Sequence, residues 1–127
     1  MPRKILVIDD EEETLEYIKT GLELNGYDVV TTIDTLKAID IAKKEKPDMI
    51  VLDFVMSGTD WNSICSSLGA SAVTKDIPVI FITGDLTPEI RRNIAQSKVY
   101  FCILKPFEIS ELISRIEDSL AIHSTKK

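Results

Sequence analysis

Residues 48–53 read Asp-Met-Ile-Val-Leu-Asp, an apolar run held between two carboxylates. Four consecutive apolar residues do not alternate between core and solvent, so the run indicates a strand buried on both faces. Such strands are typical of parallel sheets covered by helices on each side. The second carboxylate, Asp53, then stands at the carboxyl end of the strand, the edge at which open parallel sheets bind ligands.

Four further short runs rich in Ile and Val have the same form, and longer amphipathic stretches separate them. The five predicted strands are Lys4–Ile8, Tyr27–Thr32, Asp48–Leu52, Pro78–Thr83 and Val99–Leu104. Glu11–Leu24 and Ile109–Leu120 each place their apolar residues on one helical face. Gly26 and Pro47 are stop signals after the first two helices. This alternation predicts parallel strands joined by right-handed crossovers in a single three-layer α/β/α sandwich.

Composition limits the functions that the chain can serve. Its 127 residues are 44% hydrophobic and contain no repeat or linker, so we expect one domain over residues 1–127 with a core of about 3–122. A formal net charge of −6 argues against direct binding of nucleic acid. No apolar run approaches the roughly 18 residues of a membrane span. With no signal-peptide core and no metal-ligand spacing at Cys65 and Cys102, we expect a cytoplasmic protein with reduced thiols.

Polar residues with complementary chemistry follow the predicted strands. Asp9 and Asp10 follow the first, Asp53 the third, Thr83 ends the fourth and Lys105 follows the fifth. Three converging carboxylates repel one another unless a hard cation such as Mg²⁺ lies between them. A lysine ammonium and a threonine hydroxyl suit phosphoryl oxygens. The set predicts a phosphoryl-transfer site in which the carboxylate of Asp53 is the nucleophile.

These motifs resemble those of response-regulator receiver domains of two-component signalling, over nearly the whole chain. The resemblance rests on Asp9-Asp10 after Ile-Leu-Val-Ile, Asp53 in the run 50–56, Thr83-Gly84, and Lys105-Pro106-Phe107. It implies a flavodoxin-like (βα)5 fold with the strand order 2-1-3-4-5, an order that general accounts of such folds give for a receiver protein.

The resemblance also implies a role for each acidic residue. Asp53 is the phosphoacceptor, and it takes the phosphoryl group from a phosphohistidine. Asp10 and Asp53 ligate Mg²⁺ through their carboxylates, the backbone carbonyl of Val55 is a third ligand, and Asp9 holds the ion through water.

By the same resemblance, Lys105 and Thr83 contact the phosphoryl oxygens, and Thr83 moves towards them when Asp53 is phosphorylated. That movement changes the surface of the fourth helix, fifth strand and fifth helix. The implied partners are a sensor histidine kinase or phosphotransfer protein and a downstream protein or output domain, with the chain itself a monomer or weak dimer. A cis peptide at Lys105-Pro106 is also a family feature.

The chain departs from the family pattern in the loop after Asp53 and on the fifth strand. Ser57 replaces the usual proline and Trp61 the usual glycine. Cys102 stands where a switch aromatic is usual, with Phe101 beside it as a candidate for the displaced aromatic.

Two further positions bear on assembly and on phosphate lifetime. Tyr100 and Phe101 replace the acidic residues of receivers that dimerise like winged-helix transcription factors, although Arg115 matches. We therefore do not expect that dimer. Apolar Val55 cannot orient an attacking water by a hydrogen bond, so we expect a long-lived phosphoryl group, with Asp85 as a second influence.

Two alternative functions stay open at this point. A haloacid-dehalogenase-type phosphatase also uses an aspartate nucleophile, but it needs Asp-x-Asp after the first strand, where this chain has Asp9-Asp10-Glu11. A pseudo-receiver that binds partners without phosphorylation fits the departures at Ser57, Trp61 and Cys102. Glu11, Glu12 and Glu13 are interpreted as helix-dipole residues, and His123 as part of a solvated tail.

Overall fold

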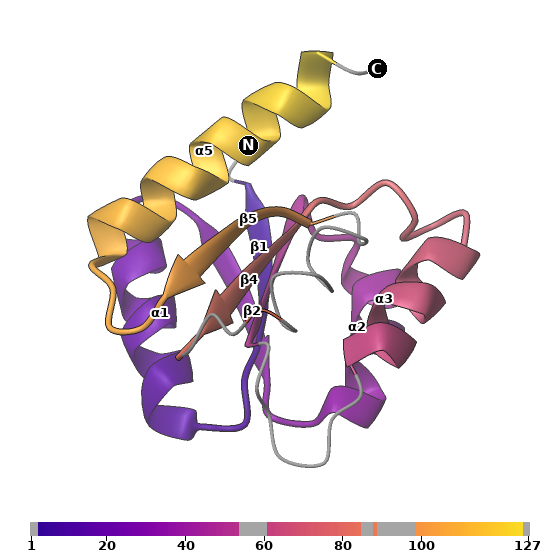
Figure 1. The fold of residues 1–127 in the computed structure, drawn as a ribbon, viewed down its shortest axis with the longest axis horizontal. Helices are drawn as coiled ribbons and strands as arrows, with labels where there is room; N and C mark the ends of the chain where they lie inside the picture. The colour runs from indigo at the N-terminus through magenta and orange to yellow at the C-terminus, as the bar shows by residue number, and fades with distance from the viewer. Residues whose placement is uncertain (1–2, 54–60, 85–87, 89–98, 126–127) are drawn as a thin grey trace.

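The computed structural model of the chain describes residues 3–53, 61–84, 88 and 99–125, and it shows one parallel sheet (Figure 1). The strands lie in the order β2-β1-β3-β4-β5. Their bounds are β1 Lys4–Ile8, β2 Asp28–Thr32, β3 Met49–Asp53, β4 Val79–Thr83 and β5 Val99–Leu104. The predicted fold class and strand order are both confirmed.

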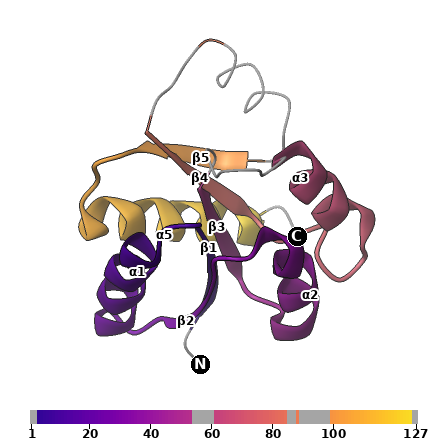
Figure 2. The same cartoon turned by 90° about the horizontal axis from the view of Figure 1, so that it is seen from below.

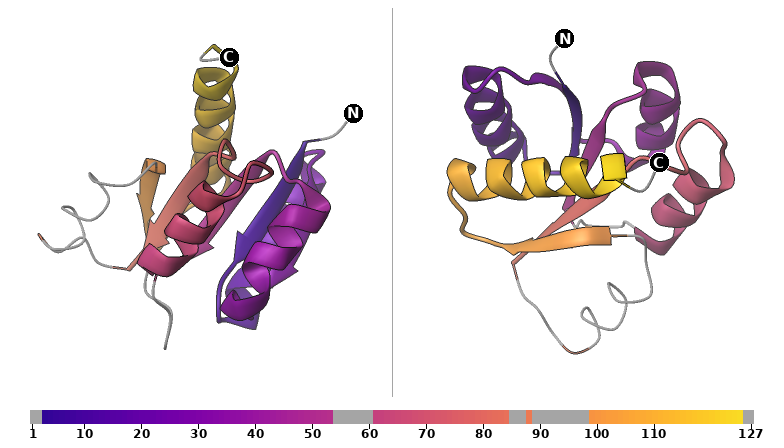
Figure 3. Two further views of the ribbon diagram at one scale, coloured as in Figure 1. Left: turned by 90° about the vertical axis from the view of Figure 1, so that its right-hand side faces the viewer. Right: turned by 90° about the horizontal axis from the view of Figure 1, so that it is seen from above.

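Helices cover both faces of the sheet. Their bounds are α1 Glu12–Leu24, α2 Thr35–Glu45, α3 Trp61–Ala70 and α5 Ile109–Thr125. Helices α1 and α5 lie on one face and α2 and α3 on the other, as the views along the sheet show (Figures 2 and 3). The fourth helix that the resemblance implies falls largely outside the described residues. Within the described residues, no helix is long and apolar enough to cross a bilayer.

The core consists of two apolar clusters separated by the sheet. Because successive residues of a strand point to opposite faces, each central strand contributes to both clusters. Ile80 and Ile82 of β4 pack with α1 and α5, whereas Val79 and Phe81 pack on the side of α2 and α3. All five residues of β3 are buried, as the unbroken apolar run predicted.

Two glycines fix the position of the first helix. Gly26 has a φ of 89°, a conformation that suits glycine, just after the C-cap residue Asn25. Gly21 lies inside α1 against the first residue of α5, where a Cβ would come 2.6 Å from Cγ1 of Ile109. The close approach of α1 to α5 therefore depends on the absence of a side chain at position 21.

The predicted boundaries are right for β1 and β5 and slightly wrong elsewhere. β3 begins at Met49. Asp48, just before it, is hydrogen-bonded to β1 twice: its backbone N–H donates to the carbonyl of Lys4 at 2.8 Å, and its carboxylate accepts the backbone N–H of Lys4 at 2.8 Å. It ends at Asp53, which pairs with Ile82 in the register of β4. Helix α5 continues to Thr125, so His123 lies within the helix and the prediction of a tail there is wrong.

Candidate phosphoacceptor and metal site

The predicted site residues of β1, β3, β4 and β5 meet at the carboxyl edge of the sheet. β3 lies between β1 and β4, and β5 follows β4, so the parallel order brings all four strand ends to one edge. Asp53 pairs with Ile82, one residue before Thr83, whose side chain is buried. The backbone N–H of Lys105 donates to the carbonyl of Thr83 at 2.8 Å, which continues the β4–β5 pairing past the end of the strand.

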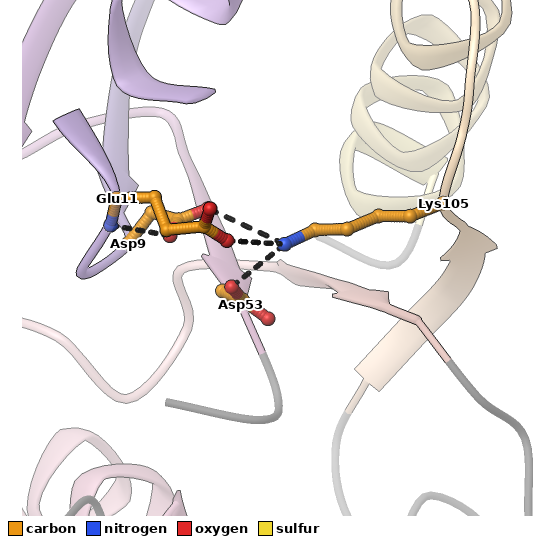
Figure 4. A network of polar contacts seen from close by, with 4 residues as sticks. All are labelled: Asp9, Glu11, Asp53 and Lys105. Atoms are coloured by element: carbon orange, nitrogen blue, oxygen red, sulfur yellow. Dashed lines mark hydrogen bonds and ion pairs between the residues drawn. The ribbon is translucent and has the colours of Figure 1, made fainter. Parts of the chain in front are cut away.

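Lys105 and Asp53 form the shortest ion pair of the site. The Nζ atom of Lys105 lies 2.9 Å from Oδ2 of Asp53, a charge-assisted hydrogen bond. Figure 4 shows the lysine side chain reaching across the strand ends to the carboxylates. The Asp53 side chain is only 3% exposed, so its buried negative charge needs a partner, and the ammonium of Lys105 supplies the opposite charge.

Two more carboxylates surround the same ammonium. Nζ of Lys105 lies 3.8 Å from Oδ2 of Asp9 and 3.7 Å from Oε1 of Glu11. Burial alone lowers the pKa of Lys105, but the hydrogen bond and charge of Asp53, followed by the charges of Asp9 and Glu11, raise that pKa overall. The lysine is therefore held in its charged form.

Asp9 is a buried carboxylate close to that of Asp53. Its side chain is 1% exposed. One oxygen accepts the backbone N–H of Glu11 at 3.0 Å, whereas Oδ2 accepts no hydrogen bond from the described residues. Burial is the main reason that the pKa of Asp9 rises from 3.8 to about 7. The charge of Asp53 adds to the rise, whereas the Glu11 N–H and the charge of Lys105 oppose it. A cation beside Asp9 would offset the free-energy cost of burying its charge and would reduce its repulsion by Asp53.

The structure gathers the oxygens that such a cation needs. One carboxylate oxygen each from Asp9, Asp10, Glu11 and Asp53 lies within 4.8 Å of all the others. Asp10 and Glu11 are exposed, which leaves one side of the group open to water. Oxygen ligands with room for water match the preferences of Mg²⁺.

A sequence model described as the response regulator receiver domain matches residues 5–117. The chain belongs to this family. The DNA-binding dual master transcriptional regulator RpaA of Synechocystis is 33% identical over 118 residues, which are 91% of this chain and 48% of that protein. The transcriptional regulatory protein PrrA of Mycobacterium tuberculosis is 31% identical over 114 residues, 90% of this chain and 48% of that protein. The chain thus spans about half the length of these curated relatives.

Solved structures of receiver domains share the fold. A CheY-like receiver domain protein of Methanospirillum hungatei has a TM-score of 0.90 at 18% identity, with both chains covered completely. The receiver domain of the sensor histidine kinase PA1611 of Pseudomonas aeruginosa, solved with a magnesium ion in its active-site cleft, has a TM-score of 0.85 at 23% identity. That match covers 95% of this chain and 99% of the other. These likenesses concern the fold.

For this receiver domain, the structure brings together most of the predicted site residues. It places Asp9, Asp10 and Asp53 in one group, and Lys105 beside two of them. The peptide bond between Lys105 and Pro106 is cis. Val55 lies outside the described residues, so its predicted role as a carbonyl ligand stays a prediction.

Glu11 is the residue whose place in the site we did not predict. We had interpreted it as a helix-dipole residue, and it does occupy the N-cap position of α1, although its side chain makes no capping hydrogen bond. Its position three residues after the end of β1 was the available signal, because every other site residue also lies near a strand end. Glu12 and Glu13 do lie in the first turn of α1, where acidic residues favour the helix dipole.

Phe101 and Cys102 are neighbours in β5 of this receiver domain, and their side chains lie on opposite faces of the sheet. Phe101 packs on the side of α1 and α5, and the guanidinium carbon of Arg115 lies 5.1 Å from the centroid of its ring. Cys102 packs on the opposite face with the cluster that contains Phe81. Thr83 follows Phe81 by two residues and so shares the face of Cys102. Phe101 therefore does not replace the missing switch aromatic, and that interpretation is wrong.

The other departures lie mostly beyond what the structure describes. Ser57 and Asp85 fall outside the described residues. The side chains of Trp61 and Tyr100 do as well, although their backbones belong to α3 and β5.

Proposed function

We propose that the chain is a phosphorylation-driven switch in which Asp53 accepts the phosphoryl group of a phosphohistidine on a sensor kinase or phosphotransfer protein. The observation that supports this most directly is the 2.9 Å pair between Asp53 and Lys105, set within a group of carboxylates that suits Mg²⁺. The fold alone does not decide function, and the same sheet carries many activities. The arrangement of these side chains is what favours phosphoryl transfer.

In the proposed reaction, a carboxylate oxygen of Asp53 attacks the phosphorus atom. A bond forms between that oxygen and phosphorus as the bond from phosphorus to the histidine nitrogen breaks, and the imidazole leaves with the electron pair. Phosphoryl transfer needs positioning and neutralisation of charge more than covalent assistance. Lys105 supplies positive charge next to the acceptor, and the buried hydroxyl of Thr83 lies at the end of the neighbouring strand.

Mg²⁺ is the proposed cofactor. Asp10 and Asp53 would hold it directly, Asp9 would hold it through water, and the backbone carbonyl of Val55 would be a third protein ligand. Two observations support the fit: the oxygens that lie within 4.8 Å of one another, and the buried Oδ2 of Asp9 that accepts no hydrogen bond from the described residues. When bound, the ion supplies positive charge for the acceptor and for the oxygens of the transferred group.

The chain acts as a signalling domain whose catalysis extends only to its own phosphorylation and dephosphorylation. Membership of the receiver family favours this function over the dehalogenase-type phosphatase that we had considered. We propose that a downstream protein or output domain recognises the phosphorylated form through β5, α5 and the expected fourth helix. The similarity to transcriptional regulators about twice as long supports an output domain as that partner.

Incubation with Mg²⁺ and acetyl phosphate tests the acceptor. We expect a mass gain of one phosphoryl group that is lost in Asp53→Asn. It should persist in the matched control Asp40→Asn, which changes an exposed aspartate of α2. No mass gain in the wild type, together with no Mg²⁺-dependent binding of beryllofluoride, would support the pseudo-receiver alternative instead.

A further inference from the structure

The ammonium of Lys105 is shared among three carboxylates that differ in their freedom to move. Asp53 and Asp9 are 3% and 1% exposed, whereas the Glu11 side chain is 65% exposed. Glu11 comes from the start of α1, while Asp53 ends β3, so the two carboxylates approach Nζ from different elements (Figure 4). Of the three, Glu11 is the carboxylate that can leave the lysine with the least disturbance of the core.

The Glu11 carboxylate has no other described hydrogen-bonding role. Its side chain does not cap α1, and the hydrogen bond that fixes Asp9 comes from the Glu11 backbone N–H rather than from the carboxylate. The carboxylate instead lies 3.7 Å from Nζ of Lys105, and both side chains line an open pocket between α1 and the segment after β5. A change confined to the Glu11 side chain should therefore affect Lys105 without removing a helix cap or the Asp9 hydrogen bond.

We propose that Glu11 is a positioning residue that draws the Lys105 ammonium towards α1 and competes with the phosphoryl group for its charge. The inference rests on the proposed function, in which Lys105 must contact phosphoryl oxygens. An ammonium partly neutralised by Glu11 attracts those oxygens less strongly, since its hydrogen bonds and field are divided among more acceptors. Glu11 thereby lowers the affinity of the site for the phosphoryl group, because Lys105 is shared between the two.

The size of the effect follows from exposure. Pairs between exposed charges contribute about 0.2–1 kcal/mol, which corresponds to about 1.4- to 5-fold in an equilibrium constant. Glu11→Gln keeps the shape of the side chain and removes its charge. At saturating Mg²⁺ we expect it to raise the affinity for beryllofluoride by about 1.4- to 5-fold. Saturation matters because loss of a nearby carboxylate should also weaken Mg²⁺ itself.

Calorimetric titration with beryllofluoride measures that affinity. The matched control is Glu12→Gln, which removes the same charge from the next residue. Glu12 is exposed and, in the described part of the chain, is not among the ion-pair partners of Lys105. We expect the control to match the wild type. In a Lys105→Met background, the effect of Glu11→Gln should fall by at least half. The inference would be overturned if Glu11→Gln had the same effect with and without Lys105, or if the two glutamate substitutions had the same effect. Either result would show that removal of any negative charge near the site raises the affinity, without a specific pair between Glu11 and Lys105.

A second measurement needs neither Mg²⁺ nor a phosphoryl analogue. Urea unfolding of the metal-free wild type, Glu11→Gln, Lys105→Met and the double variant forms a double-mutant cycle. We expect the two substitutions to be non-additive by about 1.4- to 5-fold in the unfolding equilibrium constant, and strict additivity would overturn the inference. If the wild type bound no beryllofluoride, the proposed function would fail, and the cycle would still decide whether Glu11 holds Lys105.

Discussion

Replacement of Asp9 by asparagine should stabilise the metal-free protein near pH 8, although it removes a charged partner of Lys105. The Asp9 side chain is buried, its Oδ2 accepts no hydrogen bond from the described residues, and Asp53 lies nearby. Asparagine keeps an oxygen for the backbone N–H of Glu11, which Asp9 accepts at 3.0 Å. The substitution therefore removes the charge and retains the main structural hydrogen bond.

The magnitude follows from the pKa of Asp9, which rises from 3.8 to about 7, chiefly through burial. Because the folded pKa is above the unfolded one, the stabilising contribution is complete below pH 3.8 and is lost as the pH rises to about 7. At about 1.4 kcal/mol per pH unit, the charged form costs the fold up to about 4 kcal/mol above that pH. That shift already includes the opposing charge of Lys105, so we expect a gain of up to about 4 kcal/mol in Asp9→Asn at pH 8.

Urea unfolding followed by circular dichroism measures the difference between the two proteins at pH 5, 6, 7 and 8, with a chelator present. We expect the advantage of Asp9→Asn to shrink by about 1.4 kcal/mol per pH unit below pH 7. Saturating Mg²⁺ should also reduce it at pH 8, because a bound cation stabilises the ionised wild type more than the variant.

Asp40→Asn is the matched control, since it changes an exposed carboxylate of α2 and should show no such pH dependence. A wild type at least as stable as Asp9→Asn at pH 8 without metal would refute the reasoning. An advantage that did not change between pH 5 and pH 8 would also refute it, because it would not arise from ionisation of Asp9.

Three further predictions test packing, pairing and phosphate lifetime. Gly21→Ala should destabilise the protein by about 1–3 kcal/mol in urea unfolding, although alanine favours helices, because its Cβ would lie 2.6 Å from Ile109. In an Ile109→Ala background, which lacks the crowded atoms, Gly21→Ala should cost less, and a more stable Gly21→Ala in the wild type would contradict the packing. Lys105→Ala should destabilise the metal-free protein by about 1–3 kcal/mol in the same assay, because the buried Asp53 loses its partner at 2.9 Å; unchanged stability would count against that pairing. Val55→Asn should shorten the phosphoryl lifetime of Asp53, measured by the decay of the phosphorylated mass, and an unchanged decay would exclude Val55 as its determinant.

The strand ends were the part of the site that could be predicted without coordinates. Asp9, Asp53, Thr83 and Lys105 each follow or end an apolar run, and parallel strands must bring such residues to one edge. The exact bounds of the strands could not be predicted in the same way, because they depend on partners far away in the chain. The carboxylate of Asp48, just before β3, accepts a hydrogen bond from the N–H of Lys4, 44 residues away.

The role of Glu11 could not be predicted from its own neighbourhood. Three consecutive acidic residues at a helix start have a sufficient local explanation in the helix dipole, which holds for Glu12 and Glu13. What distinguishes Glu11 is the lysine that follows β5, and that contact exists only because α1 and the segment after β5 lie side by side.

The sequence by itself determined the kind of fold and the chemistry available at its edge, because the apolar runs and the residues that follow them are local in the chain. Only the tertiary structure decided which of these side chains contact one another and at what distance. It places one ammonium 2.9 Å from Asp53, 3.7 Å from Glu11 and 3.8 Å from Asp9, and it turns Phe101 and Cys102 to opposite faces of the sheet. These distances depend on strand register and helix packing, which arise from contacts between residues far apart in the chain.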